Sequence, residues 1–407
     1  MSSVPMELVP YASLLTEVLM GVDTEKRNYQ ELGNEISIET GAIAASMDVL
    51  PRGKDDFLPM FTVKTKCFYP KTQKAFELME EVVFESRLDD KKRLKEIMGQ
   101  IYTNLKMMLT ESGHKTAANR AMSYFSGYAQ YKEEIQGISM FESIKNWYEN
   151  FDEEYENIVN GLEEARKAIF QKQNLIVSYT GKEEKPEFMA ESLSHFAERL
   201  YPDQEKTSGV HVACHQRNEG FATAGGVCYV ACAGNFMDQG FEYTGALKVL
   251  QMIFSYEYLW IQLRVKGGAY GCMCSFGNQG DSMFVTYRDP NLTETYDVYE
   301  HAAQFVEEFD ADERDMKKYI IGTISSMDMP MGPDDMGARS FNAYLMGKTE
   351  EELQKDRDQV LGCTKEKIRA LAPLVKAVVD AGNRCCIGNE EKIRHAENCF
   401  GEIRNLL

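Results

Sequence analysis

Apolar residues recur at helical intervals through residues 246–263 and predict a buried helix there. Its apolar positions include Leu247, Leu250, Phe254, Leu259 and Leu263. Gly267 and Gly268 follow this segment, and residues 269–276 have the composition of a strand. Because glycine permits backbone conformations that other residues avoid, this stretch predicts a sharp turn from helix into strand.

The pattern predicts the same order of elements in two halves of the chain. The first half has predicted helices near 14–19 and 29–35, strands at 41–47 and 60–67, helices through 70–171, a strand at 174–179 and a helix at 186–200. The second half has predicted paired strands within 219–234, a helix at 244–263, strands at 269–276 and 283–288, helices through 292–381 and a strand at 384–387. Residues 202–209 are polar and rich in turn formers, so we expect a domain boundary there.

Short segments also occupy matching places in the two halves. Residues 40–45 correspond to 267–272, and residues 179–184 correspond to 387–392. We therefore predict an α+β fold of two homologous domains, 1–200 and 201–407, each a mostly antiparallel sheet with helices packed on one face. The second copy has strands before its first helix that the first copy lacks. Domain 1–200 is thus expected to be missing its first strands, as in a fragment of a longer protein.

Length and composition support two globular domains and exclude several partners. A chain of 407 residues exceeds what one core usually serves, and 43% of its residues are hydrophobic. The net charge of -19, with basic residues interleaved among acids, argues against nucleic acid as a partner. No apolar run is long enough to span a bilayer, and the N-terminus does not have the pattern of a signal peptide. We expect a soluble, cytoplasmic protein with no membrane partner.

The ten cysteines give no sign of a metal or redox site. No two of them have the Cys-x-x-Cys spacing, and several lie inside apolar, strand-like segments. We interpret them as buried free thiols, as a reducing compartment allows. Two acidic pairs, Glu80-Glu81 and Asp89-Asp90, lie on a helical pattern and the turn after it, where charge usually marks a solvated face.

Arg264 and Tyr270 are the candidate functional residues, because they flank the predicted turn. A turn of this kind can direct both side chains into one cleft. An arginine offers five N–H donors in a rigid fork and a tyrosine offers a phenolic hydroxyl, so the pair could hold a peptide carbonyl or stabilise an oxyanion. From these residues alone, a surface arginine beside a core tyrosine is the ordinary interpretation.

Several ordered motifs resemble one family. Residues 242–250, 258–260, 264–271 and 287–291 resemble the C-terminal half of the presequence-protease branch of the pitrilysin/insulinase zinc metallopeptidases. Residues 32–37, leading into Thr40-Gly41, resemble the third domain of the same family. Residues 201–407 would then be the fourth domain, and the resemblance covers essentially the whole chain.

The resemblance implies a clamshell enzyme that degrades short unfolded peptides inside a closed chamber. It implies that Arg264 and Tyr270 match the substrate-binding Arg and Tyr of the family. It also implies that the N-terminal half of the same protein is the partner of this chain and carries the zinc, its ligands and the general base. The face that this half normally covers would make self-association possible.

The chain departs from the family in one respect that concerns the chemistry. Metal binding in this family needs His-x-x-Glu-His on a helix, and the motif does not occur among the six histidines. The only close pair is His211 and His215, with Cys214 in the position expected for Glu. In an extended stretch two residues four apart lie roughly 13 Å apart, which is too far for one metal. We therefore predict no metal ligand, no cofactor and no catalytic residue in this chain, and no activity of the chain alone.

Two other classes of protein remain open. The chain could be a naturally separate, non-catalytic subunit or scaffold that pairs with a zinc-bearing chain. It could also be a peptide-binding module whose cleft serves recognition only. Zinc-dependent hydrolysis by the isolated chain would contradict all three interpretations.

Overall fold

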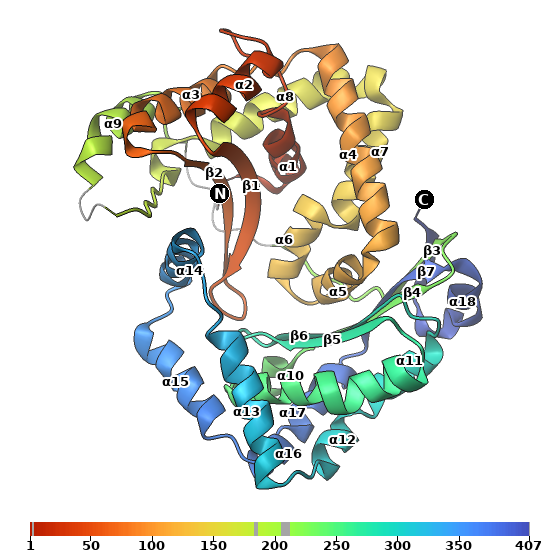
Figure 1. The fold of residues 1–407 in the computed structure, drawn as a ribbon. Coiled ribbons are helices and arrows are strands. Elements are labelled where there is room, and N and C mark those ends of the chain that lie inside the picture. Colours follow the sequence, from red (N-terminus) through yellow and green to blue (C-terminus); the bar gives the residue numbers. More distant parts are fainter. Residues whose placement is uncertain (2–3, 183–185, 205–211, 407) are drawn as a thin grey trace.

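The computed structural model describes residues 1, 4–182, 186–204 and 212–406. Figure 1 shows the first half of the chain above the second, with helices α4–α7 running between them on one side. The helices of the first half are α1 (Val9–Val18), α2 (Tyr29–Glu39), α3 (Thr72–Phe84), α4 (Lys91–Glu111), α5 (Gly113–Ser123), α6 (Gly127–Gln136), α7 (Ile138–Glu149), α8 (Phe151–Ile169) and α9 (Ala190–Glu198). Its strands β1 (Ala42–Pro51) and β2 (Phe57–Lys66) form one antiparallel hairpin.

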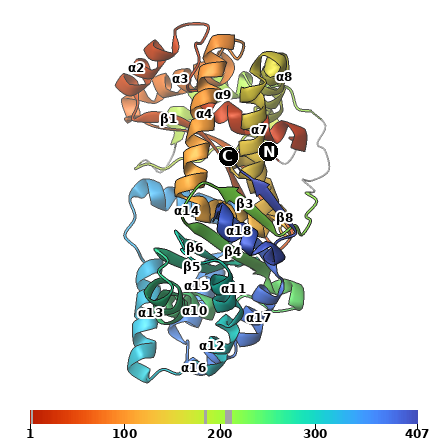
Figure 2. The same ribbon diagram turned by 90° about the vertical axis from the view of Figure 1, so that its right-hand side faces the viewer.

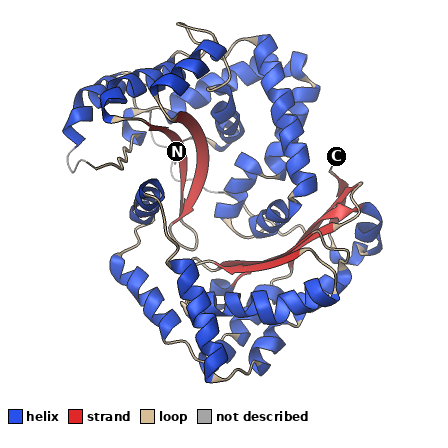
Figure 3. Ribbon diagram, in the orientation of Figure 1, coloured by secondary structure: helices blue, strands red, loops and turns tan. Residues whose placement is uncertain are grey.

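The second half contains a six-stranded sheet and most of the remaining helices. Its strands are β3 (Glu219–Thr223), β4 (Cys228–Asn235), β5 (Gly271–Phe276), β6 (Asp281–Tyr287), β7 (Asn383–Asn389) and β8 (Glu402–Asn405). Its helices are α10 (Ala246–Ile253), the π-helical segments η6 (Phe254–Tyr258) and η7 (Trp260–Lys266), α11 (Thr293–Glu300), α12 (Ala302–Glu308), α13 (Glu313–Met327), α14 (Pro333–Leu345), α15 (Glu350–Leu361), α16 (Lys365–Arg369), α17 (Ala372–Asp380) and α18 (Glu390–His395). The α+β class is confirmed, and Figure 3 shows how strongly helices predominate.

The six-stranded sheet is mixed, with the order β5-β6-β4-β7-β3-β8. The pairs β5–β6, β6–β4 and β4–β7 are antiparallel, whereas β3 is parallel to both β7 and β8. The prediction that the strands within 219–234 pair with each other is wrong, because β7 lies between β3 and β4 and pairs with both. The short, polar strand β8 was not predicted.

In the second half, the helices of that half pack on one face of the sheet, as predicted, and the other face is covered by α5 of the first half. Alternate residues of β4 face opposite sides: Cys228, Val230 and Cys232 belong to a cluster formed within the second half, which includes residues of α10 and α17. Tyr229, Ala231 and Ala233 belong to another cluster, which includes Ala117, Ala118 and Ala121 of α5. The first half therefore covers the face that the second half leaves open, as Figures 1 and 2 show. The physical reason is that β4 is apolar at nearly every position, so both of its faces must be buried.

The predicted strand at 174–179 is also wrong. Residues 172–174 form a 3-10 turn, and residues 175–179 belong to no strand in the described part of the chain. Leu175, Ile176 and Val177 are 37%, 50% and 45% exposed. These apolar residues have the composition typical of a strand, but a strand also needs a neighbouring strand to pair with.

Buried apolar residues otherwise gather separately within each half. One cluster lies within residues 4–200, a second within 228–396, and a third draws on both halves. The domain division near residue 200 and the homology of the halves stay predictions. All ten cysteines are free thiols, and five of them lie in the sheet as buried residues. Across the described ranges, no helix has the length and apolarity that crossing a bilayer requires.

Glu80 and Glu81 differ from the expectation of a solvated face. They are only 4% and 2% exposed, on the inner side of α3. Glu80 contacts His195 at 2.9 Å, and Glu81 contacts Arg27 at 3.0 Å. These cations come from elements distant in the sequence, so the local charge pattern could not reveal the pairing.

Candidate functional site

The predicted turn from helix into strand is confirmed. The helix that begins with α10 widens into π-helical turns from Phe254 and ends at Lys266. Gly268 has φ +81°, a left-handed conformation that favours glycine. The amides of Gly268 and Ala269 donate to the carbonyls of Arg264 and Leu263 at 3.0 and 2.9 Å, which closes the helix end just before β5. Widened helical turns of this kind are frequent at functional sites.

The turn brings Arg264 and Tyr270 together, as the sequence predicted. The guanidinium carbon of Arg264 lies 4.7 Å from the centre of the Trp260 ring and 4.9 Å from the centre of the Tyr270 ring. Trp260 is 44% exposed and Tyr270 is 65% exposed. Both rings thus attract the cation while leaving it accessible to solvent, and cation–π contacts at exposed sites contribute about 0.5–1 kcal/mol each.

The aromatic contacts continue across β6 to the first half of the chain. The Tyr270 ring meets Tyr287 edge-on, with ring centres 5.7 Å apart, and Tyr287 meets His114 of α5 at 4.9 Å. Burial, together with the charge of Lys115, lowers the pKa of His114, so its imidazole is neutral at pH 7. The candidate site is therefore connected to the contact between the two halves. Sequence analysis did not find His114 as a neighbour of the site, because α5 is far away in the sequence.

The histidines considered as metal ligands do not form a site in the described part of the chain. His211 lies outside the described residues, and His215 is an exposed residue of an irregular segment. Within the described ranges, no three Asp, Glu, Cys or His residues are grouped as metal ligands would be.

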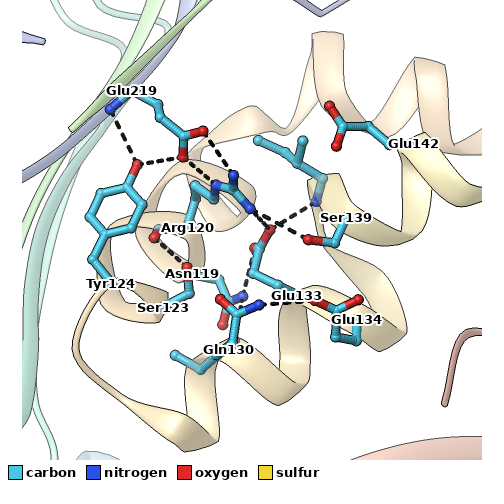
Figure 4. A network of polar contacts seen from close by, with 12 residues as sticks. Asn119, Arg120, Ser123, Tyr124, Gln130, Glu133, Glu134, Ser139, Glu142 and Glu219 are labelled. Carbon is cyan, nitrogen blue, oxygen red and sulfur yellow. Dashed lines mark hydrogen bonds and ion pairs between the residues drawn. The ribbon is translucent and has the colours of Figure 1, made fainter. Parts of the chain in front are cut away.

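A buried network of charges lies between the halves, close to the other end of the sheet (Figure 4). Arg120 of α5 donates two hydrogen bonds to the Glu219 carboxylate of β3, at 2.6 and 2.8 Å, and one to Glu133 of α6 at 3.2 Å. The Tyr124 hydroxyl also donates to Glu219 at 3.0 Å. Arg120, Glu133 and Glu219 are at most 2% exposed. The network fixes α5 on the sheet.

The two carboxyl groups of this network have opposite pKa shifts. Burial alone would raise the pKa of Glu219, but the hydrogen bonds and charge of Arg120 lower it below its usual value. Burial raises the pKa of Glu133, in spite of Arg120 and the Asn119 amide. Glu219, which binds Arg120 through both oxygens, is therefore the principal counter-ion. Sequence analysis missed this network completely.

Comparison with solved structures shows where this fold occurs. The fold is similar to pitrilysin, with a TM-score of 0.56, 14% identity, and coverage of 93% of this chain and 38% of that chain. It is also similar to a conserved protein from Enterococcus faecalis V583, with a TM-score of 0.65, 12% identity, and coverage of 96% and 92% of the two chains. The fold is that of one half of a pitrilysin-type peptidase.

Sequence comparison then identifies the branch of that family. Residues 1–146 match the family model described as peptidase M-16C associated, and residues 218–389 match the PreP C-terminal domain. Protein HypA of Clostridium perfringens is 35% identical over 408 residues, which cover 100% of this chain and 42% of that protein. Presequence protease 1 of Arabidopsis thaliana, chloroplastic/mitochondrial, is 30% identical over 412 residues, which cover 98% of this chain and 38% of that protein.

The chain belongs to the presequence-protease family and corresponds to its C-terminal half. The resemblance given by the sequence motifs is thereby confirmed. The chain spans about two fifths of the length of these two relatives.

Proposed function

We propose that this chain is the C-terminal, non-zinc-binding half of a metalloendopeptidase that degrades short unfolded peptides in a closed chamber. In this proposal the N-terminal half of the same protein supplies the zinc and the general base, and this chain supplies Arg264 and Tyr270 to the substrate. Family membership supports the overall role, because the matching relatives are more than twice as long as this chain.

The observation that carries the roles of the two residues is the environment of the Arg264 guanidinium. It is held between the Trp260 and Tyr270 rings, and no carboxylate lies within 4.0 Å of it in the described ranges of the chain. Its N–H donors are therefore available to a substrate. Arg264 would donate to a peptide carbonyl, and the Tyr270 hydroxyl would donate to the oxyanion that develops when that carbonyl is attacked.

The test uses the full-length protein and an internally quenched, unstructured peptide. Loss of a charge-assisted hydrogen bond of about 1.5–3 kcal/mol predicts that Arg264→Ala lowers kcat/KM by roughly 10- to 100-fold. Tyr270→Phe should lower kcat/KM by a similar factor. Arg314→Ala, at an exposed arginine on α13, is the matched control and should have no effect. An unchanged kcat/KM for Arg264→Ala and Tyr270→Phe would refute the assigned roles.

The isolated chain gives a second test of the proposal. It should not hydrolyse the same peptide with added zinc, because the ligands and base belong to the other half. Chelator-sensitive turnover would contradict the proposal. If the chain joined to its N-terminal half bound peptide but never cleaved it, the alternative of a non-catalytic subunit or peptide-binding scaffold would be favoured.

A further inference from the structure

A continuous row of contacts between guanidinium groups and aromatic rings extends beyond Arg264 and Tyr270. It begins at Trp260 and Arg264, continues through the Tyr270 and Tyr287 rings, and ends at Arg288. The guanidinium carbon of Arg288 lies 5.5 Å from the centre of the Tyr287 ring. Two guanidinium groups therefore flank a pair of tyrosine rings that stand at the paired ends of adjacent strands, β5 and β6.

The two guanidinium groups of this row have no carboxylate close to them in the described part of the chain. The sequence contains 64 acidic and 45 basic residues, and most arginines in the described part are within 4.0 Å of a carboxylate. In the same described part, neither Arg264 nor Arg288 has such a partner, although acids outnumber bases. Arg288 is exposed, contacts the Tyr287 ring and the Tyr229 hydroxyl, and feels the charge of Glu111 only from a greater distance. An accessible guanidinium without a close counter-ion is a receptor for an anion.

The backbone holds Arg288 in a fixed place. Its φ of 51° is left-handed, a conformation that costs a non-glycine residue roughly 1–2 kcal/mol. The Arg288 carbonyl accepts the Tyr270 amide at 3.3 Å, which ties Arg288 to the candidate site. The next residue, Asp289, exchanges two backbone hydrogen bonds with Cys228, at 2.7 and 2.8 Å. The unfavourable conformation is thus maintained from both sides, as is common where a side chain must be presented to a ligand.

We propose that Arg288 is a second peptide-binding residue, which binds a carboxylate of the substrate at a distance from the scissile bond. This inference rests on the proposed function, in which Arg264 and Tyr270 bind at the scissile bond itself. The peptide would pass over the Tyr270 and Tyr287 rings, which offer apolar contact at little entropic cost. The carboxylate can belong to an acidic side chain or to the C-terminus of the peptide, and a guanidinium recognises both in the same bidentate way.

The experiment measures kcat/KM of the full-length protein on four quenched peptides of one unstructured sequence. The four peptides combine Glu or Gln at one position with a C-terminal acid or amide, and the set of four is repeated with that position moved along the sequence. A charge-assisted hydrogen bond of about 1.5–3 kcal/mol predicts that the wild type prefers the carboxylate by roughly 10- to 100-fold. Glu-over-Gln preference at one position identifies an acidic side chain as the ligand, and acid-over-amide preference identifies the C-terminus.

Two substitutions at Arg288 test its part in that preference. Arg288→Asn removes the charge and suits a left-handed backbone, because Asn is enriched at positive φ, so the preference should fall to near unity. Arg288→Lys retains the positive charge and should therefore keep most of the preference for the carboxylate. The inference is overturned if the wild type shows neither preference, or if Arg288→Asn leaves the ratio unchanged while lowering kcat/KM equally for all four peptides.

The same peptides separate this inference from the proposed function. Arg264→Ala should slow the hydrolysis of all four peptides and keep their ratio. If Arg264→Ala had no effect while the ratio still depended on Arg288, the substrate-binding role of Arg264 would be refuted and the carboxylate site would stand. The reverse result would retain the proposed function and eliminate the role of Arg288.

Discussion

Arg120 and Arg264 show two opposite uses of the same side chain within one protein. Arg120 is 2% exposed and is surrounded by the carboxylates of Glu219 and Glu133 (Figure 4). Arg264 is partly exposed and contacts the faces of Trp260 and Tyr270. A guanidinium whose donors are occupied inside the protein serves the fold, whereas one that is held only through its π face keeps its donors for a ligand.

The contrast between Arg120 and Arg264 would be wrong if Arg120 were not needed for stability. Arg120→Met removes both close hydrogen bonds to the buried Glu219 carboxylate and leaves Arg404, at 3.7 Å, as its nearest cation, so the free energy of unfolding should fall by about 3–5 kcal/mol. Arg264→Met, the matched control at the accessible arginine, should change it by no more than about 1–2 kcal/mol, the contribution of its two cation–π contacts. Urea unfolding followed by circular dichroism measures both variants. Equal losses of stability would show that the two environments do not differ in the way proposed.

Glycine substitutions test whether the turn after the accessible Arg264 is needed for activity. Gly268 and Gly240 have φ of +81° and +80°, and a Cβ at either one meets nothing closer than 3.4 Å. Each Gly→Ala change should therefore cost about 1–2 kcal/mol of stability through backbone strain alone. Only Gly268→Ala should also lower kcat/KM of the full-length protein, by up to roughly 10-fold, because this residue sets the position of Tyr270 relative to Arg264. A similar loss of activity in Gly240→Ala would attribute the effect to global destabilisation.

The smallest expected effect is on the pH dependence of stability. It concerns Glu133, which is a partner of the buried Arg120. Because burial raises the pKa of Glu133 above its usual value of 4.5, the folded chain binds this proton more tightly than the unfolded chain. Glu133 therefore stabilises the fold most below pH 4.5, and this contribution is lost as the pH rises through the folded-state pKa. Glu133→Gln should remove that decline in unfolding free energy between acidic and neutral pH. If the wild type instead gained stability over Glu133→Gln as the pH rose, the pKa shift would have the opposite sign.

Local signals were sufficient for the helix, the turn and the proximity of Arg264 and Tyr270. The helical spacing of apolar residues through 246–263 and the glycine pair after it determined the helix, the turn and the position of Arg264 beside Tyr270. These features depend on residues close together in the sequence. What the pattern could not show was the π-helical widening, since the same apolar positions suit either helix.

Long-range contacts were the part that the sequence did not reveal. The segment at 174–179 has the composition of a strand but not its pairing, and β7 inserts between two strands that are neighbours in sequence. Arg120 and Glu219 are 99 residues apart, and the residues next to them in the sequence do not indicate a buried ion pair. One signal could have predicted the contact between the halves: β4 is apolar on both faces, so a second layer had to cover it.

The position of β7 has a consequence for the synthesis of the protein. This strand lies near the middle of the sheet, yet its residues 383–389 leave the ribosome long after those of β3 and β4, which flank it. Until then the two flanking strands have no partner between them, and the Arg120 side of α5 faces an incomplete sheet. We expect the nascent chain to expose apolar strand edges from the synthesis of β4 until that of β7, which makes it a client for chaperones that bind such edges.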